Sequence, residues 1–262
     1  MHPPLAGKSI VILGGTTGIG LSAAKALLAA GARVVVVGKD PETTAAAEMV
    51  LGSHTLAFTG EAADPATAEL AIGEAVAAFG RFDGLYHVAG GSGRKFGDGP
   101  LHELTDDGWR ATLELNLTSV MMSNRAAVRQ FLRSGTGGAI LNVSSVLGWS
   151  PSPKHFATHA YAAAKSAIIG FSKSLAAHYA AQGIRVNVLA PALVDTPMAR
   201  RAAESEEVQR YIRSKQPLDG GRIGQPEDLD GAAIWLLSDA SKFCTGQVVA
   251  VDGGWSVSEG AA

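Results

Sequence analysis

The chain has 262 residues, 47% of them apolar and 18% charged, with a formal net charge of -2 and a sequence pI of about 6.4. This length and apolar content suit one large α/β domain, and the charge gives no basic surface for a nucleic acid or a membrane. The single cysteine, Cys244, excludes an internal disulfide and a multi-cysteine metal site, so we expect a cytoplasmic protein with a small-molecule partner.

The chain begins with an apolar strand, a glycine-rich turn and a helix. Residues 9–13 form the strand, Gly14 to Gly20 form the turn, and residues 21–30 have helical composition. Glycines let the backbone turn tightly and approach a pyrophosphate, whose charge is favoured by the amides at a helix N-terminus. The spacing is Gly-x-x-x-Gly-x-Gly, not the commoner Gly-x-Gly-x-x-Gly. The alternative is a glycine-rich turn that binds nothing.

The alternation of strand and helix continues along the whole chain. Further strands are predicted at residues 33–37, 55–58, 82–88, 139–144, 184–189 and 247–251. Helices are predicted at residues 41–50, 65–79, 106–133 and 160–182. This pattern predicts one α/β domain over residues 1–262, a Rossmann-type fold with a doubly wound parallel sheet of about seven strands.

Ligands of such sheets bind beyond the carboxyl ends of the strands, so residues that follow strands should gather on one rim. These residues are Gly14 to Gly20, Lys39, Glu61, Ala89 to Gly91, Ser144, Ser145 and Pro191 to Thr196. Residues 196–216 carry interleaved basic and acidic side chains, which predicts a solvated helical lid over the substrate. Alternatively, those basic residues could bind an anionic or hydroxyl-rich substrate.

Tyr161 and Lys165 are spaced for proton transfer. Residues four apart on a helix share a face, so the phenol and the ammonium should point into one site. A neighbouring ammonium is expected to lower the pKa of the phenol from its ordinary value near ~10. Tyr161 is therefore a candidate acid or base, although the same spacing is also typical of a surface pair on an amphipathic helix.

Several motifs, in the order in which they occur along the chain, resemble those of the short-chain dehydrogenase/reductase family. This family includes 3-oxoacyl-carrier-protein reductases and sugar or steroid alcohol dehydrogenases. The resemblance covers nearly the whole chain. It is carried by Gly14, Gly18, Ile19, Gly20, Asn116, Ser145, Tyr161, Lys165, the segment from Pro191 to Met198, and Asp252 to Gly254. It implies an NAD(P)(H)-dependent oxidoreductase that transfers hydride between nicotinamide and a secondary alcohol or ketone.

The resemblance also implies a role for each residue. The catalytic set is Asn116, Ser145, Tyr161 and Lys165, with Tyr161 as general acid or base and Ser145 steadying the reacting oxygen. Lys165 would hold the nicotinamide ribose, and Asn116 would hold a water. The implied cofactor-binding residues are Gly14, Thr16, Thr17, Gly18, Ile19, Gly20, Gly38, Lys39, Glu61, Ala62, Ala89, Gly90, Tyr161, Lys165, Pro191, Val194 and Thr196.

Other positions bear on the substrate side. Only one of Ser144 and Ser145 can face the substrate, and the resemblance favours Ser145. Residues 149–156 resemble an insertion beside the substrate, and His159 is expected to line the pocket. No histidine has the spacing of a metal site, so no metal is expected. Leu13, His87, Val88 and Ala192 depart from the residues usual in the family.

The residues that follow the strand at 33–37 predict which cofactor is preferred. Gly38 stands where related NAD enzymes carry a carboxylate, and Lys39 can place an ammonium beside a 2′-phosphate. NADP(H) is therefore expected to be preferred, with NAD(H) possible. Asp40 could instead turn toward the ribose, and Thr17 stands where many NADP-dependent relatives carry a second basic residue.

The resemblance implies a homotetramer built through the helices at 106–133 and 160–182. Small residues on these helices allow close approach, and the expected interface positions are Met121, Ala126, Ala163 and Ala167. Two other functions stay open: a catalytically silent dinucleotide-binding sensor, and an epimerase or dehydratase on the same fold. The complete catalytic set argues against the sensor.

Overall fold

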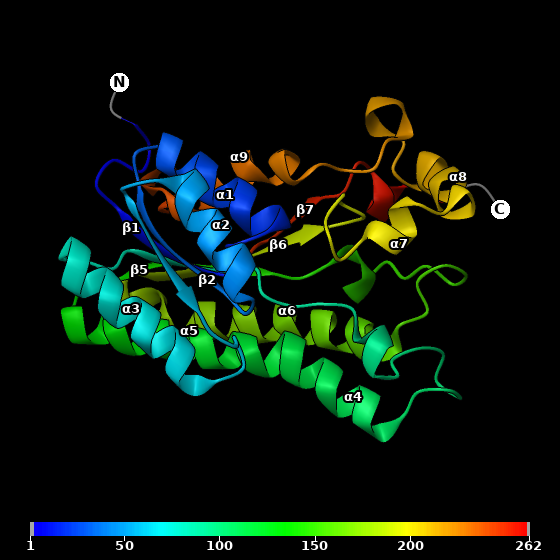
Figure 1. Ribbon diagram of the computed structural model, residues 1–262, viewed down its shortest axis with the longest axis horizontal. Helices are drawn as coiled ribbons and strands as arrows, with labels where there is room; N and C mark the ends of the chain where they lie inside the picture. Colours follow the sequence, from blue (N-terminus) through cyan, green and yellow to red (C-terminus); the bar gives the residue numbers. More distant parts are fainter. Residues whose placement is uncertain (1–2, 261–262) are drawn as a thin grey trace.

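The computed structural model describes residues 3–260, so the predicted domain over residues 1–262 extends two residues beyond that range at each end. It contains a seven-stranded sheet with helices on both faces (Figure 1). The strands are β1 (Ser9–Leu13), β2 (Arg33–Gly38), β3 (Thr55–Thr59), β4 (Gly84–His87), β5 (Gly138–Val143), β6 (Ile184–Pro191) and β7 (Val248–Val251). All are paired in parallel in the order β3-β2-β1-β4-β5-β6-β7, which confirms the Rossmann-type fold.

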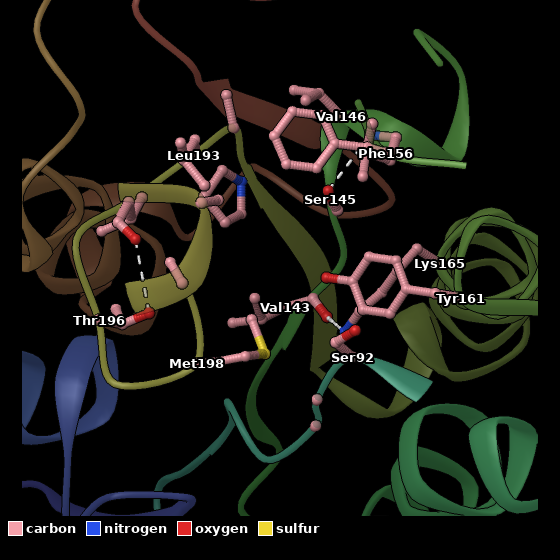
Figure 2. A pocket seen from close by; sticks show the side chains of 18 of the residues that line it. Ser92, Val143, Ser145, Val146, Phe156, Tyr161, Lys165, Leu193, Thr196 and Met198 are labelled. Atoms are coloured by element: carbon pink, nitrogen blue, oxygen red, sulfur yellow. Dashed lines mark hydrogen bonds between the residues drawn. The ribbon is translucent and has the colours of Figure 1, made fainter. Parts of the chain in front are cut away.

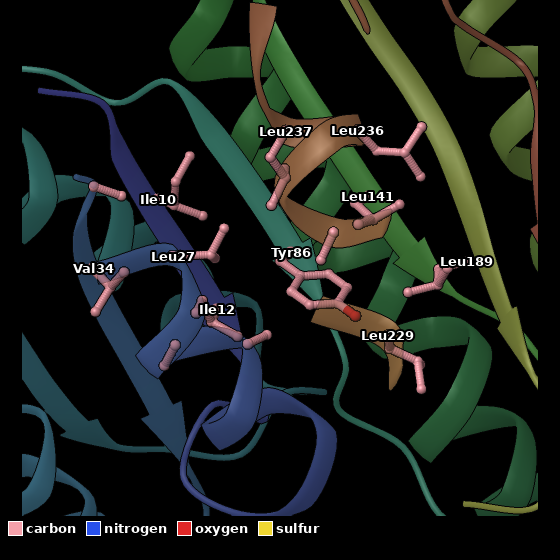
Figure 3. Packing of buried hydrophobic residues seen from close by; sticks show 14 of the residues in the cluster. Ile10, Ile12, Leu27, Val34, Tyr86, Leu141, Leu189, Leu229, Leu236 and Leu237 are labelled. Atoms are coloured by element: carbon pink, nitrogen blue, oxygen red, sulfur yellow. The ribbon is translucent and has the colours of Figure 1, made fainter. Parts of the chain in front are cut away.

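The apolar strands are explained by burial on both faces of the sheet. In β1, Ile10 and Ile12 belong to one hydrophobic cluster, whereas Val11 and Leu13 belong to another. Successive side chains of a strand point to opposite faces, so a strand covered on both sides must be apolar throughout. Figure 3 shows the first cluster, where Ile10 and Ile12 lie near Leu27 of the first helix.

Helices α1, α2 and α9 lie on one side of the sheet, and α3, α5 and α6 lie on the other (Figure 1). The helices are α1 (Gly18–Ala29), α2 (Pro41–Leu51), α3 (Pro65–Phe79), α4 (Asp106–Leu113), α5 (Ser119–Ser134), α6 (His159–Tyr179), α7 (Arg200–Ala203), α8 (Glu206–Lys215) and α9 (Asp230–Leu237). Within residues 3–260, no helix combines the length and the apolar character that crossing a membrane requires.

Three features differ from the predicted elements. The predicted helix at 106–133 is two helices, α4 and α5, joined by the π-helical turn Glu114–Thr118. Helix α9 was not predicted, because its eight residues are short and mostly apolar and so carry no clear helical periodicity. Ala126, predicted at a subunit interface, is only 4% exposed and packs in the core of its own chain.

Candidate active site

The glycine turn joins β1 to α1 at the carboxyl edge of the sheet. Helix α1 begins at Gly18 instead of the predicted residue 21, so Gly18, Ile19 and Gly20 all lie in its first turn. Thr17, the N-cap residue, makes no side-chain capping bond, and the first turn contains no acidic residue. The first amides of α1 are therefore free of side-chain acceptors and can bind an anion.

Two glycines of this turn leave no room for a side chain. A Cβ atom at Gly20 would lie 2.0 Å from the Gly14 carbonyl oxygen, and one at Gly14 would lie 2.6 Å from the Ala89 nitrogen. Gly14 also has a φ of +80°, which favours glycine. The turn thus presents bare backbone beside a helix N-terminus, and this surface fits the pyrophosphate of a dinucleotide.

A pocket of about 180 Å³ opens beside this turn. Seven of the predicted cofactor-binding residues line it: Ile19, Gly90, Tyr161, Lys165, Pro191, Val194 and Thr196. The other predicted residues lie outside its lining. These ten residues are found near the ends of β1 to β4 and in the first turn of α1: Gly14, Thr16, Thr17, Gly18, Gly20, Gly38, Lys39, Glu61, Ala62 and Ala89. In Figure 2 the Tyr161 hydroxyl and the Ser145 side chain face the same open space.

The two serines after β5 have different partners. The Ser144 hydroxyl donates a hydrogen bond of 2.6 Å to the backbone oxygen of Lys165, so it ties the end of the strand to α6. The Ser145 hydroxyl accepts a bond of 3.2 Å from the Leu147 amide, and its own proton can still be donated into the pocket. The geometry therefore leaves Ser145 as the serine available to a ligand.

Tyr161 and Lys165 share one face of α6, as their spacing predicts. The Lys165 ammonium lies 5.4 Å from the centre of the Tyr161 ring and donates a bond of 3.0 Å to the Val143 oxygen. Lys165 is only 3% exposed, and burial lowers its pKa to about 8.

The pKa of Tyr161 was expected to be lowered by Lys165, and this expectation is wrong for the structure as it stands. Burial raises the pKa of Tyr161 to about 12, and the Ser145 hydroxyl opposes this only in part. The ammonium lies over the ring and bonds to Val143, so it does not act mainly on the phenol oxygen.

Asn116 is buried and does not line the pocket. Its side-chain oxygen accepts from the Gly91 amide at 3.0 Å, and its nitrogen donates to the oxygens of Gly91 and Thr112, both at 2.9 Å. A Cβ atom at Gly90 would lie 2.8 Å from the Asn116 oxygen and 3.4 Å from the Lys165 nitrogen. Asn116 thus fixes the loop beside Lys165, and its predicted role in holding a water stays a prediction.

His87, one of the departures from the family pattern, supports the neighbouring loop. Burial, and then the charge of Lys165, lower the pKa of His87 to about 3, so its ring is neutral. Its Nε2 lies 3.1 Å from the Ala89 oxygen and its Nδ1 lies 2.7 Å from the Ser123 hydroxyl. Because the Ala89 oxygen can only accept, Nε2 carries the proton and Nδ1 accepts from Ser123.

Asp98 is a residue that the sequence reasoning missed. It is 4% exposed, and its two carboxylate oxygens accept bonds of 3.0 Å from the backbone amides of Ala160 and Tyr161. Thr158, the local N-cap residue of α6, makes no capping bond of its own. A loop distant in sequence therefore caps the helix that carries Tyr161, and no local sequence signal could have shown this.

Aromatic side chains close the outer wall of the pocket. Phe156 and Trp255 both line it, with ring centres 5.9 Å apart, and the Trp255 nitrogen donates a bond of 2.9 Å to the Ser150 oxygen. The predicted insertion at 149–156 thus borders the pocket. His159 does not line it, contrary to expectation, because it is the first residue of α6 and is exposed.

Comparisons with known proteins agree with this geometry. A family model described as Enoyl-(Acyl carrier protein) reductase matches residues 14–256. Cis-4-hydroxycyclohexanecarboxylate dehydrogenase of Sinomonas cyclohexanicum is 35% identical over 258 residues, which cover 98% of this chain and 99% of that protein. 2,5-dichloro-2,5-cyclohexadiene-1,4-diol dehydrogenase of Sphingobium indicum is 34% identical over 253 residues, 96% and 98% of the two chains.

Among solved structures, a short-chain type dehydrogenase/reductase from Mycobacterium ulcerans has a TM-score of 0.89 and 32% identity. The likeness covers 98% of this chain and 92% of that one. Sequence motifs, fold and full-length relatives all point the same way, so the resemblance read from the sequence is confirmed. The chain belongs to the short-chain dehydrogenase/reductase family.

Proposed function

We propose that this chain is an NAD(P)(H)-dependent dehydrogenase that interconverts a secondary alcohol and its ketone, with Tyr161 as the general acid or base. The observation that carries the proposal is the meeting of the Tyr161 and Ser145 hydroxyls in one pocket, beside a backbone turn that fits a dinucleotide. Two hydroxyls on one side of a pocket can both reach a single substrate oxygen.

The chain's own residues account for the proton. With a pKa of about 12, the Tyr161 phenol stays protonated near neutral pH and can donate its proton to a carbonyl oxygen. Ser145 donates to the same oxygen and stabilises the charge that develops there. Lys165, held by the Val143 oxygen, places a positive charge 5.4 Å from the centre of the ring on which the transfer leaves a negative charge.

The residues present would hold the cofactor on the other side of the pocket. The amides of the glycine turn would bind the pyrophosphate, and Lys165 would bond the nicotinamide ribose. Thr196 would extend this surface, because a Cβ atom at Gly18 would lie 3.1 Å from its methyl carbon. When bound, the nicotinamide accepts or supplies the hydride.

NADP(H) is the proposed preference. A Cβ atom at Gly38 would lie 2.1 Å from the Thr16 hydroxyl oxygen, so the place of the NAD-selecting carboxylate has no room for a side chain. Asp40 is engaged elsewhere, because its carboxylate accepts a bond of 2.8 Å from the Thr43 amide and caps α2. Lys39 is exposed and is left as the charged group beside the ribose position.

Residues 196–216 are proposed to act as a lid. They contain α7 and α8, and five of them line the pocket: Thr196, Met198, Ala199, Arg201 and Ala202. An ion pair of 2.7 Å between Lys154 and Glu207 joins α8 to the insertion loop. A lid tied to this loop can cover a substrate and exclude water from the proton transfer.

We also propose a cytoplasmic homotetramer. On α6, Ala163 and Ala167 are exposed, and Met121 of α5 is half-buried, so these three positions are available to a second subunit. Cys244 is a free thiol, which suits a reducing compartment. Sedimentation at micromolar concentration is expected to show a tetramer, and a monomer alone would contradict this part of the proposal.

The substrate class follows from the pocket wall and from the relatives. Phe156, Leu193 and Trp255 give the pocket an apolar wall that suits a carbon ring. Two of the relatives are named for alcohols on a six-membered ring. A cyclic secondary alcohol is therefore the proposed type of substrate.

The direct test is a set of cyclohexanols and cyclohexanones assayed with both cofactors by nicotinamide absorbance. Turnover with at least one of them is expected. Cofactor binding without turnover of any alcohol or ketone would favour the sensor. Conversion of substrate without net change in the cofactor would favour an epimerase or dehydratase.

A further inference from the structure

Two arginines line the pocket without a carboxylate partner. Arg94 comes from the 3₁₀ turn Gly93–Phe96 that follows β4, and Arg201 comes from α7. Within residues 3–260, neither makes an ion pair. The negative charge of Asp98 raises the pKa of Arg94. Both carboxylate oxygens of Asp98, however, already accept hydrogen bonds from backbone amides at the start of α6.

The positively charged guanidinium groups of Arg94 and Arg201 repel each other. Burial lowers the pKa of Arg94, and the positive charge of Arg201 lowers it further. A guanidinium remains charged at any ordinary pH, so two like charges border the same space. An anion placed between them would remove the repulsion and bond to both, since guanidinium groups match the two oxygens of a carboxylate.

Arg94 stands on a firmly held segment. The Ser92 hydroxyl accepts from the Arg94 amide at 3.4 Å, and the Arg94 side chain donates to the His155 oxygen at 3.4 Å. A Cβ atom at Gly93 would lie 1.8 Å from the Thr112 hydroxyl oxygen, so the turn is pressed against α4. Arg201, in contrast, belongs to the proposed lid.

We propose that Arg94 and Arg201 bind a carboxylate of the substrate, which makes the substrate a hydroxy acid or oxo acid with an apolar body. This inference rests on the proposed function. The reacting oxygen would lie at Tyr161 and Ser145, the body would lie against Leu193 and Trp255, and the carboxylate would lie between the arginines. Because one arginine is on the lid, an anion held by both also joins the lid to the fixed turn.

The test compares two probes of nearly equal shape, cyclohexanecarboxylate and cyclohexanecarboxamide, titrated calorimetrically into the full protein with NADP⁺ present. The carboxylate is expected to bind roughly tenfold to a hundredfold more tightly than the amide, as charge-assisted hydrogen bonds would give. Arg94→Gln and Arg201→Gln should each remove most of this difference. Added salt should weaken binding of the carboxylate only.

Arg200→Gln is the matched control, because Arg200 precedes Arg201 on the same short helix but does not line the pocket. This variant should keep the preference for the carboxylate. Equal binding of the two probes, binding of neither, or the same loss in Arg200→Gln would overturn the inference. So would a loss of NADPH affinity in the Arg94 and Arg201 variants as large as the loss for the carboxylate, since the arginines would then serve the cofactor.

The experiments give different results depending on whether the carboxylate site or the dehydrogenase function is wrong. Turnover of neutral cyclohexanols without any preference for the carboxylate would sink this inference alone. Carboxylate binding that depends on both arginines, with no cofactor turnover for any alcohol or ketone, would sink the dehydrogenase proposal alone.

Discussion

The glycine turn presents backbone atoms to a ligand, whereas the outer wall of the pocket presents side chains. The turn is one continuous segment, residues 14–20, in which a Cβ atom at Gly20 would collide with the Gly14 oxygen. The wall is assembled from Arg94, Phe156, Arg201 and Trp255, which come from four separate parts of the chain.

This difference separates what the fold must keep from what it can change. A side chain added at Gly14 or Gly20 disturbs the backbone itself, because the nearest atoms there are main-chain atoms. A side chain exchanged in the wall alters the chemistry of the pocket and leaves the sheet untouched. We therefore expect changes in the turn to affect the cofactor and changes in the wall to affect the substrate.

Apart from loss of the Tyr161 hydroxyl itself, the largest expected effect is on the pH dependence of alcohol oxidation. It comes from the titration of Tyr161 and Lys165, which line the pocket, and not from the glycine turn. Oxidation needs the Tyr161 phenolate, and with a pKa raised to about 12 its fraction grows as the pH rises. Alcohol oxidation should therefore rise up to roughly tenfold per pH unit from about pH 6, and flatten above about pH 8 as Lys165 loses its proton.

Ketone reduction needs the protonated phenol, which persists throughout this range, so its rate should stay nearly flat until Lys165 titrates. Initial rates in both directions at saturating cofactor would check the contrast. A rate of oxidation that falls as the pH rises from about 6 to about 8 would contradict the assignment of Tyr161 as the base.

Gly20→Ala should break the turn. The new methyl group would lie 2.0 Å from the Gly14 oxygen, so the backbone must shift, at a cost of about 1–3 kcal/mol. If this cost falls on cofactor binding, affinity for NADPH drops roughly fivefold to a hundredfold, as fluorescence titration would show. Gly73→Ala is the control, because a Cβ atom at Gly73 of α3 meets nothing within 4 Å. Equal NADPH affinity in both variants would argue against the turn as the pyrophosphate site.

Asp98→Ala should affect both stability and turnover, because Asp98 links the loop after β4 to the helix that carries Tyr161. It leaves two backbone amides without an acceptor, which should lower the free energy of unfolding by about 1–3 kcal/mol. Displacement of Tyr161 should also lower kcat roughly tenfold at saturating cofactor, with little change in the KM for cofactor.

Asp64→Ala provides the matched control, since Asp64 caps α3 by accepting from the Ala66 amide at 2.9 Å and does not line the pocket. It should cost stability without changing kcat. Asp98→Asn, which keeps one acceptor oxygen, should recover part of the rate. A normal kcat in Asp98→Ala would mean that the carboxylate only stabilises the helix.

Lys39→Ala is expected to have the smallest effect. Lys39 is exposed, so its charge is screened, and removing it should raise the KM for NADPH roughly twofold to fivefold while leaving that for NADH unchanged. Lys242→Ala, an exposed lysine after α9, is the control. Equal effects on both cofactors, or a wild-type enzyme that strongly prefers NADH, would defeat the proposed preference for NADP(H).

The sequence was sufficient for the fold and the glycine turn because both are local patterns. Apolar runs mark the buried strands, and the turn lies within a few residues of β1. Even so, the start of α1 was placed at residue 21 instead of Gly18, and α9 was missed because it lacks an amphipathic pattern.

The wall and its supports were harder to predict, because they depend on contacts between distant segments. Nothing near Asp98 in the sequence shows that it caps α6, and nothing near Trp255 shows that it faces Phe156. His159 was expected in the pocket because it is close to Tyr161 in sequence. On a helix, however, residues two apart point in different directions, and His159 is exposed.

The role of Tyr161 as general acid is tested by single-turnover reduction of a confirmed ketone substrate by Tyr161→Phe, with NADPH binding titrated in parallel. Because the phenol oxygen carries the transferred proton, the rate should fall roughly 10²- to 10⁴-fold while NADPH affinity stays within a factor of about two. A near-normal rate, or a loss of rate explained entirely by lost NADPH binding, would contradict the role of Tyr161 as general acid.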